Sequence, residues 1–199
     1  INLRVLHGGH FYGGHIAQAM DSLKIMMANI ADLLDRQLAQ LVDYKMNNGL
    51  PRNLTGSSSE RLALNHGFKA VQIAVSAWTA EALKHTLSAS IFSRSTECHN
   101  QDKVSMGTIA ARDATRIMVL TEQVVAALAC ACVQALKLKG LNTQLTPALT
   151  AFQHWVLQSF TYVDEDRALQ NELQCLVDRL ERFELIQSLD QHHGEGKDY

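Results

Sequence analysis

The sequence predicts an all-α fold in which long antiparallel helices form part of a multi-subunit helical bundle. Ala, Leu and Gln are abundant and only two prolines occur among the 199 residues, and these three residue types lose little freedom in a helix. Apolar side chains recur every three or four residues over two long stretches, which is the helical period. We find no run with the apolar and polar alternation of a half-buried strand.

The first predicted helix runs from His15 to about Met46, a stretch that contains neither Gly nor Pro. One apolar stripe follows it at three- and four-residue steps, which places its members on one helix face. The stripe consists of Met20, Leu23, Met27, Ile30, Leu34, Leu38 and Leu41. Gly49 and Pro51 end this helix, because Gly supplies a left-handed cap and Pro cannot continue a helix.

Four further helices follow along the chain. We expect them at about Gly67–His85, Lys103–Lys137, Ala148–Tyr162 and Asp164–Leu189. Asp102 is the expected N-cap of the second of these four, where its carboxylate would accept from free backbone N–H groups. That helix is apolar on every side and rich in Ala, which favours a buried bundle helix over a dimeric coiled coil.

The chain divides into a Gly- and His-rich segment at residues 1–14, a helical part at 15–189 and a polar tail at 190–199, expected to be flexible. Two helices this long cannot hide their apolar faces within one subunit, so we expect several subunits to share one bundle. A net charge of -2 gives no basic surface for nucleic acid. The apolar run Val124–Leu136 is too short to span a bilayer, so no membrane is expected.

Cysteine and histidine spacings predict no metal site. The cysteines are Cys98, Cys130, Cys132 and Cys175. They form no Cys-x-x-Cys pair and have no zinc-type spacing with His, which favours buried free thiols in a reducing, cytoplasmic setting. No basic-then-apolar leader opens the sequence, which also favours the cytoplasm. His7, His10 and His15 are separated by glycines and have no carboxylate among them, unlike preset metal ligands.

Three irregular segments carry a resemblance to a known family. Residues 6–13 read Leu-His-Gly-Gly-His-Phe-Tyr-Gly, and residues 47–55 read Asn-Asn-Gly-Leu-Pro-Arg-Asn-Leu-Thr, with Gly-Phe-Lys following at 67–69. Residues 97–107 read Glu-Cys-His-Asn-Gln-Asp-Lys-Val-Ser-Met-Gly. In their order and separation these segments resemble the histidine, phenylalanine and tyrosine ammonia-lyases and the related aminomutases. The resemblance runs from Leu3 to about Leu189 and corresponds to the carboxy-terminal part of that family.

This resemblance implies an enzyme that eliminates ammonia from phenylalanine or tyrosine to give a cinnamate-type acid. The family uses a methylidene-imidazolone group, formed from an Ala-Ser-Gly tripeptide, as the electrophile for the substrate amino group, and a tyrosine as the base. No Ala-Ser-Gly occurs here, since Ala89-Ser90 is followed by Ile91. We therefore expect the chain to be inactive alone and to work in a homo-oligomer, a tetramer in the family, or with a separate amino-terminal fragment. A degenerate relative is the remaining alternative.

The resemblance also implies site residues. Gln101 and Glu97 match catalytic polar residues at the amino end of the substrate. The implied substrate-binding residues are Phe11, His10, Tyr12 and Asn100. A neutral Gln can hydrogen-bond there without bringing a further charge into the pocket. His10 departs from the family, which usually has Asn at this place, and an imidazole is bulkier and can titrate near neutrality.

Three other interpretations stay open. A histidine-specific lyase is one, because the Val-Ser-Met-Gly at 104–107 is common in that branch. An aminomutase, which returns ammonia to the neighbouring carbon, is the second. The third belongs to another class: a non-catalytic helical assembly module descended from the family, for which His10 is the best argument.

Overall fold

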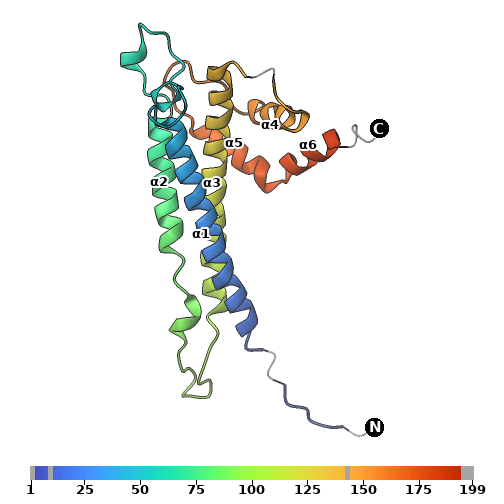
Figure 1. The fold of residues 1–199 in the computed structure, drawn as a ribbon. Coiled ribbons are helices and arrows are strands. Elements are labelled where there is room, and N and C mark those ends of the chain that lie inside the picture. The colour runs from blue at the N-terminus through green and yellow to red at the C-terminus, as the bar shows by residue number, and fades with distance from the viewer. Residues whose placement is uncertain (1–2, 9–10, 142–143, 194–199) are drawn as a thin grey trace.

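The computed structural model of the protein describes residues 3–8, 11–141 and 144–193. Within these ranges the chain forms six α-helices and no strand, which confirms the predicted all-α fold. α1 (Gly14–Val42), α2 (Lys69–Lys84) and α3 (Gly107–Lys139) form an elongated three-helix bundle (Figure 1). α1 and α3 run in the same direction and α2 runs against both, so only α2 is antiparallel to its neighbours.

α1 buries only part of the apolar stripe predicted for it: Leu38 is fully buried, Met27, Leu34 and Leu41 pack partly buried against the core, and Ile30 is about half exposed. The residues it buries are Ala17, Asp21, Lys24, Ala28, Ala31, Asp35, Leu38 and Val42. They recur at alternating four- and three-residue steps, and the alanines allow the packed helices to approach closely. Ile25, Ile30 and Leu33 of the same helix remain about half exposed. A large part of the apolar surface of α1 is therefore not covered by this chain.

The main apolar core surrounds the carboxy-terminal half of α3, where Phe68, Trp155 and Leu176 pack against it. A second, smaller cluster consists of Ala28, Ala82, Ile117 and Leu120. Closer to the amino-terminal ends of α1 and α3, the larger buried side chains of α1 are charged rather than apolar.

α3 is long and apolar enough, by length and composition, to cross a membrane. The apolar run considered from the sequence, Val124–Leu136, is shorter than the apolar part of α3. In the fold, 61% of the most apolar 18-residue stretch of α3 is buried inside the molecule. That burial is typical of the central helix of a globular core.

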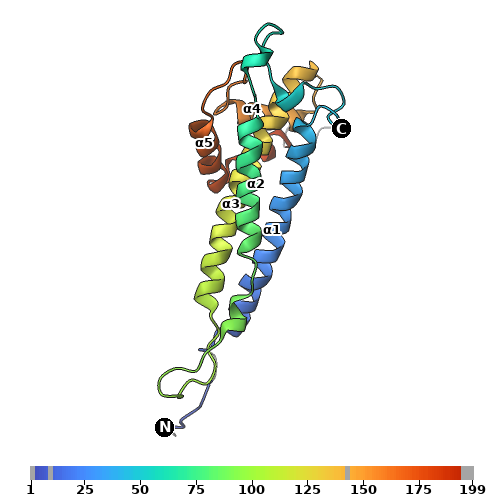
Figure 2. The same cartoon turned by 90° about the vertical axis from the view of Figure 1, so that its left-hand side faces the viewer.

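The three remaining helices pack beside the carboxy-terminal end of α3 (Figures 1 and 2). They are α4 (Pro147–Leu157), α5 (Gln170–Glu181) and α6 (Glu184–His193). The predicted helix from Asp164 to Leu189 is wrong, because its first residues are not helical and the remainder is divided at Phe183, whose φ is 57°. The predicted tail at 190–199 begins inside α6, and residues 194–199 lie outside the described part of the chain.

Side-chain interactions explain why residues 164–166 leave the helical pattern. Asp164 accepts from Lys137 at 2.8 Å, and Glu165 accepts from Arg61 at 2.8 Å. Asp166 accepts from the backbone N–H groups of His66 and Gly67 at 2.7 and 2.8 Å. Three consecutive carboxylates thus bind groups from elsewhere in the fold, and the bent, non-helical backbone at these residues competes with the helix.

The start of α3 also differs from the prediction. The helix begins at Gly107, and its N-cap is Met106 in a left-handed conformation with φ 57°. Asp102 is therefore not the N-cap. The Val104 N–H donates to the Ser93 hydroxyl at 3.0 Å, and this bond holds the preceding segment outside the helix.

All four cysteines are free, but only part of the burial prediction is right. Cys130 is buried and Cys132 is partly buried, and burial raises the pKa of both thiols. Cys98 and Cys175 are exposed, which corrects the expectation of four buried thiols.

Candidate active site

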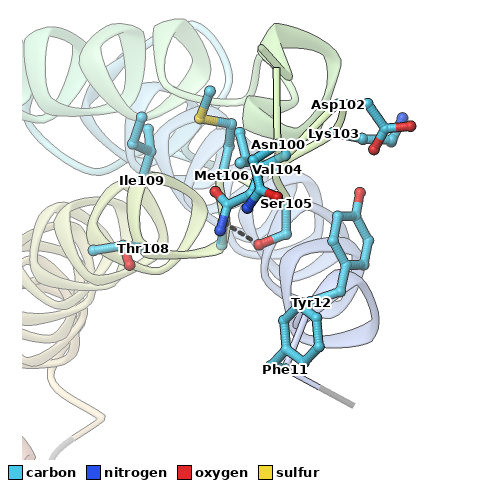
Figure 3. Close-up of a pocket in the computed structure, with 12 residues that line it drawn as sticks. Phe11, Tyr12, Asn100, Asp102, Lys103, Val104, Ser105, Met106, Thr108 and Ile109 are labelled. Carbon is cyan, nitrogen blue, oxygen red and sulfur yellow. Dashed lines mark hydrogen bonds between the residues drawn. The ribbon is translucent and has the colours of Figure 1, made fainter. Parts of the chain in front are cut away.

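A hollow of about 670 Å³ lies where the amino-terminal ends of α1 and α3 meet. Its lining includes four residues that the sequence singled out: Phe11, Tyr12, Asn100 and Gln101. The first two precede α1 and the other two come from the loop before α3, 88 or more residues later in the chain. Figure 3 shows Phe11 and Tyr12 on one side of the hollow and Thr108 and Ile109 on another.

Small residues and left-handed turns allow the two helix ends to meet. Gly13 is the N-cap of α1 with φ 73°, a conformation that costs a residue with a side chain more than Gly. A Cβ on Gly14 would lie 2.4 Å from the Tyr12 ring, so only Gly leaves room for that ring. Ser105 accepts from the Gly107 N–H at 3.3 Å, and its hydroxyl lies beside Gly13.

Both helices direct the positive ends of their dipoles toward this region. Neither α1 nor α3 has an acidic residue in its first turn, and neither N-cap residue caps its helix with a side chain. In α3 the Gly107 N–H is bound by the Ser105 hydroxyl. Free N–H groups at a helix N-terminus stabilise a negative charge that lies close to them. The region is therefore suited to a carboxylate or to an oxygen on which negative charge develops.

The loop that carries Gln101 is closed by a short antiparallel bridge to Thr96. The Thr96 hydroxyl donates to Oε1 of Gln101 at 2.9 Å, which leaves the amide nitrogen as the end that can donate to a ligand. Between the two bridge residues, Glu97, Cys98 and His99 all have positive φ, from 52° to 68°. Each such residue costs about 1–2 kcal/mol, so the sharp turn before Gln101 is strained.

The site residues that the family resemblance implies do not all line the hollow. Glu97 lies in the same loop, where it accepts from the Asn100 side chain at 3.4 Å, but it does not line the hollow. Phe11 lines the hollow with 87% of its surface exposed, so this chain supplies only one side of its surroundings. Tyr12 is 39% exposed. His10 lies outside the described residues.

A second hollow of about 780 Å³ adjoins the first and shares Tyr12 and Lys103 with it. Its lining includes Gln18, Asp21, Ser22, Ser88 and Ser90. Sequence reasoning missed these residues, because no motif contains them. The one available signal was the pair of charged residues, Asp21 and Lys24, at i and i+3 in the first half of the first helix.

Among the described residues, no group of three or more His, Cys, Asp or Glu side chains could hold a metal ion. The cluster considered at His7, His10 and His15 cannot be judged as a whole, because His10 is outside the described residues. Gln101 and the two helix ends therefore remain the chemically distinctive features of the hollow.

Comparisons with known proteins agree with the segments that carried the resemblance. Residues 1–158 match the family model described as aromatic amino acid lyase. A tyrosine ammonia-lyase from Cereibacter sphaeroides is 36% identical over 178 residues, which are 88% of this chain and 33% of that protein. Histidine ammonia-lyase 1 from Fusobacterium nucleatum is 28% identical over 191 residues, 96% of this chain and 36% of that protein.

Comparison with solved structures also finds similarity to enzymes of this kind. The crystal structure of tyrosine aminomutase from Streptomyces globisporus aligns with a TM-score of 0.90 and 29% identity, covering 96% of this chain and 36% of that one. The chain thus spans about a third of the length of the relatives it matches. Because the family model covers most of its residues, the chain belongs to the aromatic amino acid lyase family.

Proposed function

We propose that the hollow at the amino-terminal ends of α1 and α3 is one wall of the active site of an ammonia-lyase. The substrate is phenylalanine or tyrosine, and the products are ammonia and a cinnamate-type acid. One observation carries the proposal: Phe11 and Gln101, far apart in sequence, line the same hollow beside two helix N-termini whose first turns contain no acidic residue. An aromatic wall, an amide and two positive helix poles together match an aromatic amino acid with its carboxylate.

The residues present fit the methylidene-imidazolone group on which this family depends. The region beyond the first turns of α1 and α3 would hold its oxygen, because both helix ends favour negative charge and no acidic residue in those turns opposes it. When present, the group supplies the electrophile that captures the substrate amino group. Its Ala-Ser-Gly precursor is not among the 199 residues, so we propose that it comes from another part of the assembled enzyme.

Within that site each residue of this chain has a distinct role. Gln101 donates through its amide nitrogen, because Thr96 occupies the amide oxygen. Phe11 supplies an apolar wall and keeps water from the reacting atoms. Glu97 lies in the same loop and accepts from the Asn100 side chain, and we propose that its carboxylate attracts the substrate ammonium. The strained turn of residues 97–99 immediately precedes Asn100 and Gln101, which line the hollow.

Assembly with further copies is part of the proposal. The exposed apolar side chains on α1 are Ile16, Ile25, Met26, Ile30 and Leu33. They extend along most of the helix, a pattern typical of a surface covered in an oligomer. We therefore propose a homo-oligomer of the tetrameric kind that the family resemblance implies. Sedimentation at micromolar concentration is the measurement, and a well-folded monomer would contradict it.

The activity test uses the purified 199-residue chain and the enzyme assembled with an Ala-Ser-Gly segment. Each is incubated with L-phenylalanine, L-tyrosine or L-histidine, and the ultraviolet absorbance of cinnamate, coumarate or urocanate is followed. We expect no product from the chain alone and cinnamate or coumarate from the assembled enzyme. Product from the chain alone would refute the requirement for the tripeptide.

The same assay separates the alternatives. Urocanate as the main product would favour a histidine-specific enzyme, which the similarity to histidine ammonia-lyase 1 keeps as the second candidate. A β-amino acid product would favour an aminomutase. An assembled protein that forms none of these products would favour the non-catalytic helical module.

A further inference from the structure

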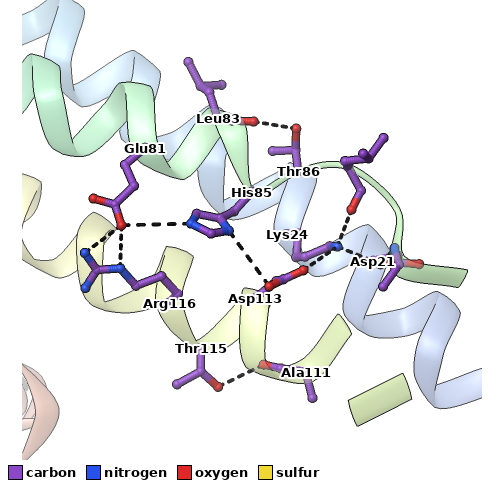
Figure 4. Close-up of polar contacts among 12 residues, drawn as sticks. Asp21, Lys24, Glu81, Leu83, His85, Thr86, Ala111, Asp113, Thr115 and Arg116 are labelled. Atoms are coloured by element: carbon purple, nitrogen blue, oxygen red, sulfur yellow. Dashed lines mark hydrogen bonds and ion pairs between the residues drawn. The ribbon is translucent and has the colours of Figure 1, made fainter. Parts of the chain in front are cut away.

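A fully buried lysine lies in the amino-terminal half of α1, away from the main apolar core around the carboxy-terminal half of α3. The Lys24 side chain of α1 is 0% exposed. Its ammonium contacts Asp21 Oδ1 at 2.8 Å, the Leu87 carbonyl at 2.7 Å and Asp113 Oδ2 at 3.6 Å. The ammonium is thus held by Asp21 and the Leu87 carbonyl at hydrogen-bond distance and by Asp113 at ion-pair distance (Figure 4). A buried charge without such partners would cost several kcal/mol.

Asp21 and Lys24 bind the same short segment through opposite kinds of backbone group. Lys24 donates to the carbonyl of Leu87, while Asp21 accepts from the N–H groups of Ala89 and Ser90 at 2.9 and 3.2 Å. Burial alone would raise the pKa of Asp21, but hydrogen bonds from Lys24, Ala89 and Ser90 outweigh it and hold that pKa well below its usual range. The carboxylate thus remains charged and continues to bind the segment.

The segment held in this way leads directly to the candidate active site. Ser88, Ser90 and Ile91 line the second hollow, next to Tyr12. Two residues beyond Ile91, Ser93 accepts from the Val104 N–H at 3.0 Å and so closes the base of the loop that carries Gln101. A displacement of residues 87–92 would therefore move that base as well.

A row of polar side chains continues from Lys24 to the surface. Asp113 lies 3.9 Å from His85 Nδ1, and His85 Nε2 lies 3.9 Å from Glu81. Glu81 accepts from Arg116 at 2.6 Å. This row of polar side chains joins α1, α2 and α3 at one level (Figure 4). At the buried position of Lys24 an apolar residue would avoid the desolvation cost of a buried charge.

We propose that Lys24 is a positioning residue of the active site. With Asp21 it fixes residues 87–92 between α1 and α3, and through the Ser93–Val104 bond it sets the position of the Gln101 loop. The functional part of this inference rests on the proposed ammonia-lyase activity, whereas its structural part does not. Lys24 contacts neither hollow and acts only through the segment that it holds.

The test compares Lys24→Met, which keeps the length of the side chain, with Lys84→Met at an exposed position on α2. Amide hydrogen exchange of the folded chain is measured first. We expect Lys24→Met to speed exchange at residues 87–106 about tenfold or more, with the middle of α3 changed by less than about twofold, and Lys84→Met to change neither. Unchanged exchange at 87–106, or a uniform increase over the whole chain, would overturn the proposal.

The second measurement uses the assembled enzyme. Lys24→Met is expected to lower kcat about tenfold while KM changes by less than about threefold, because the loop is misplaced but the substrate still enters. Faster exchange with an unchanged kcat would refute the functional part. If the wild-type assembly has no activity, the proposed function fails, while the exchange result still decides whether Lys24 fixes the segment.

Asp113→Asn provides a milder variant in case Lys24→Met does not fold. Its side chain is 29% exposed, so the substitution leaves the interior packing in place and removes one of the two carboxylates near Lys24. Exchange at residues 87–92 is then expected to rise by about threefold. No change there in Asp113→Asn, with Lys24→Met unfolded, would count against the positioning role.

Discussion

Thr96 and Gln101 hold each other through three hydrogen bonds. The Thr96 N–H donates to the Gln101 carbonyl at 2.8 Å, and the Gln101 N–H donates to the Thr96 carbonyl at 3.2 Å. The third bond joins the Thr96 hydroxyl to Gln101 Oε1 at 2.9 Å. The backbone bonds fix the turn and the side-chain bond orients the amide, so the two effects can be separated by mutation.

Replacing Gln101 by Ala is expected to lower the turnover of the enzyme while the turn between Thr96 and Gln101 stays intact. Loss of one hydrogen bond at a water-poor site costs about 1–3 kcal/mol, which corresponds to roughly a tenfold to hundredfold drop in turnover. The melting temperature should hardly change, because both backbone bonds remain. Turnover of the assembled enzyme and thermal unfolding are the measurements, and full turnover in Gln101→Ala would contradict the assigned role.

Thr96→Val tests the orientation of the amide separately. It removes only the bond to Oε1 and keeps the shape of the side chain. A neutral hydrogen bond is worth about 0.5–1.5 kcal/mol, so turnover should fall by about two- to tenfold, less than in Gln101→Ala. An effect equal to that of Gln101→Ala would mean that Thr96 itself contacts the substrate.

Thr146 caps a helix and Asp102 does not, a difference that the sequence alone did not reveal. Thr146 is the N-cap of α4 and accepts from the Leu149 N–H at 3.4 Å, whereas α3 begins at Gly107, five residues after Asp102. We expect Thr146→Ala to lower the free energy of unfolding by about 1 kcal/mol. Asp102→Ala should change it by less than about 0.5 kcal/mol. Denaturant unfolding of both variants measures these changes. A larger loss of unfolding free energy in Asp102→Ala than in Thr146→Ala would support the prediction that Asp102 is an N-cap.

The long helices were predictable because apolar periodicity and Gly or Pro stops are local features. The interruption at residues 164–169 was not, since Asp164, Glu165 and Asp166 bind partners about 100 residues away or on another helix. Local patterns also failed to predict which face of α1 is buried. Its stripe of large apolar residues is the most visible pattern, yet its smaller residues and its buried charges pack inside this chain.

The candidate site was only partly predictable for a related reason. Motif resemblance selected Phe11 and Gln101, and the fold brings both to one hollow. Lys24 and the residues of the 87–92 segment belong to no motif. A lysine in a helix is usually solvated, and the burial of Lys24 depends on Leu87 and Asp113, which are distant in sequence, as well as on Asp21 in the same helix. Spacing within one helix predicts the Asp21–Lys24 pair but not the contacts with Leu87 and Asp113.

Cys98 and Cys175 test the strain of the turn before Gln101. Both are exposed, but Cys98 has φ 52° and Cys175 lies inside α5. Cys98→Gly should raise the free energy of unfolding by about 1 kcal/mol, because Gly adopts positive φ without steric cost. Cys175→Gly should lower it by about 1 kcal/mol, the usual cost of Gly in a helix. A loss of stability in Cys98→Gly would show that the turn is not strained.

Glu122 and Glu165 should give opposite pH dependences of stability. Burial, followed by the nearby charge of Glu181, raises the pKa of Glu122. The folded state therefore disfavours the ionised form, and stability is lost as the pH rises from the ordinary carboxyl pKa through the raised one. Glu122→Gln should accordingly raise the melting temperature at pH 7, and this gain should disappear at a pH below the ordinary carboxyl pKa, where the wild-type residue is protonated in both states.

Glu165→Gln is the matched control with the opposite sign. Hydrogen bonds from Arg61 and Asn65 lower the pKa of Glu165 to about 2, so its contribution is present above the ordinary carboxyl pKa and is lost as the pH falls toward 2. Glu165→Gln should therefore lower the melting temperature at pH 7, with a smaller difference at acidic pH. Thermal melts of the wild type and both variants between pH 3 and about 7 give the comparison. A lower melting temperature for Glu122→Gln at pH 7 would show that its carboxylate is stabilised by a partner rather than opposed by burial and Glu181.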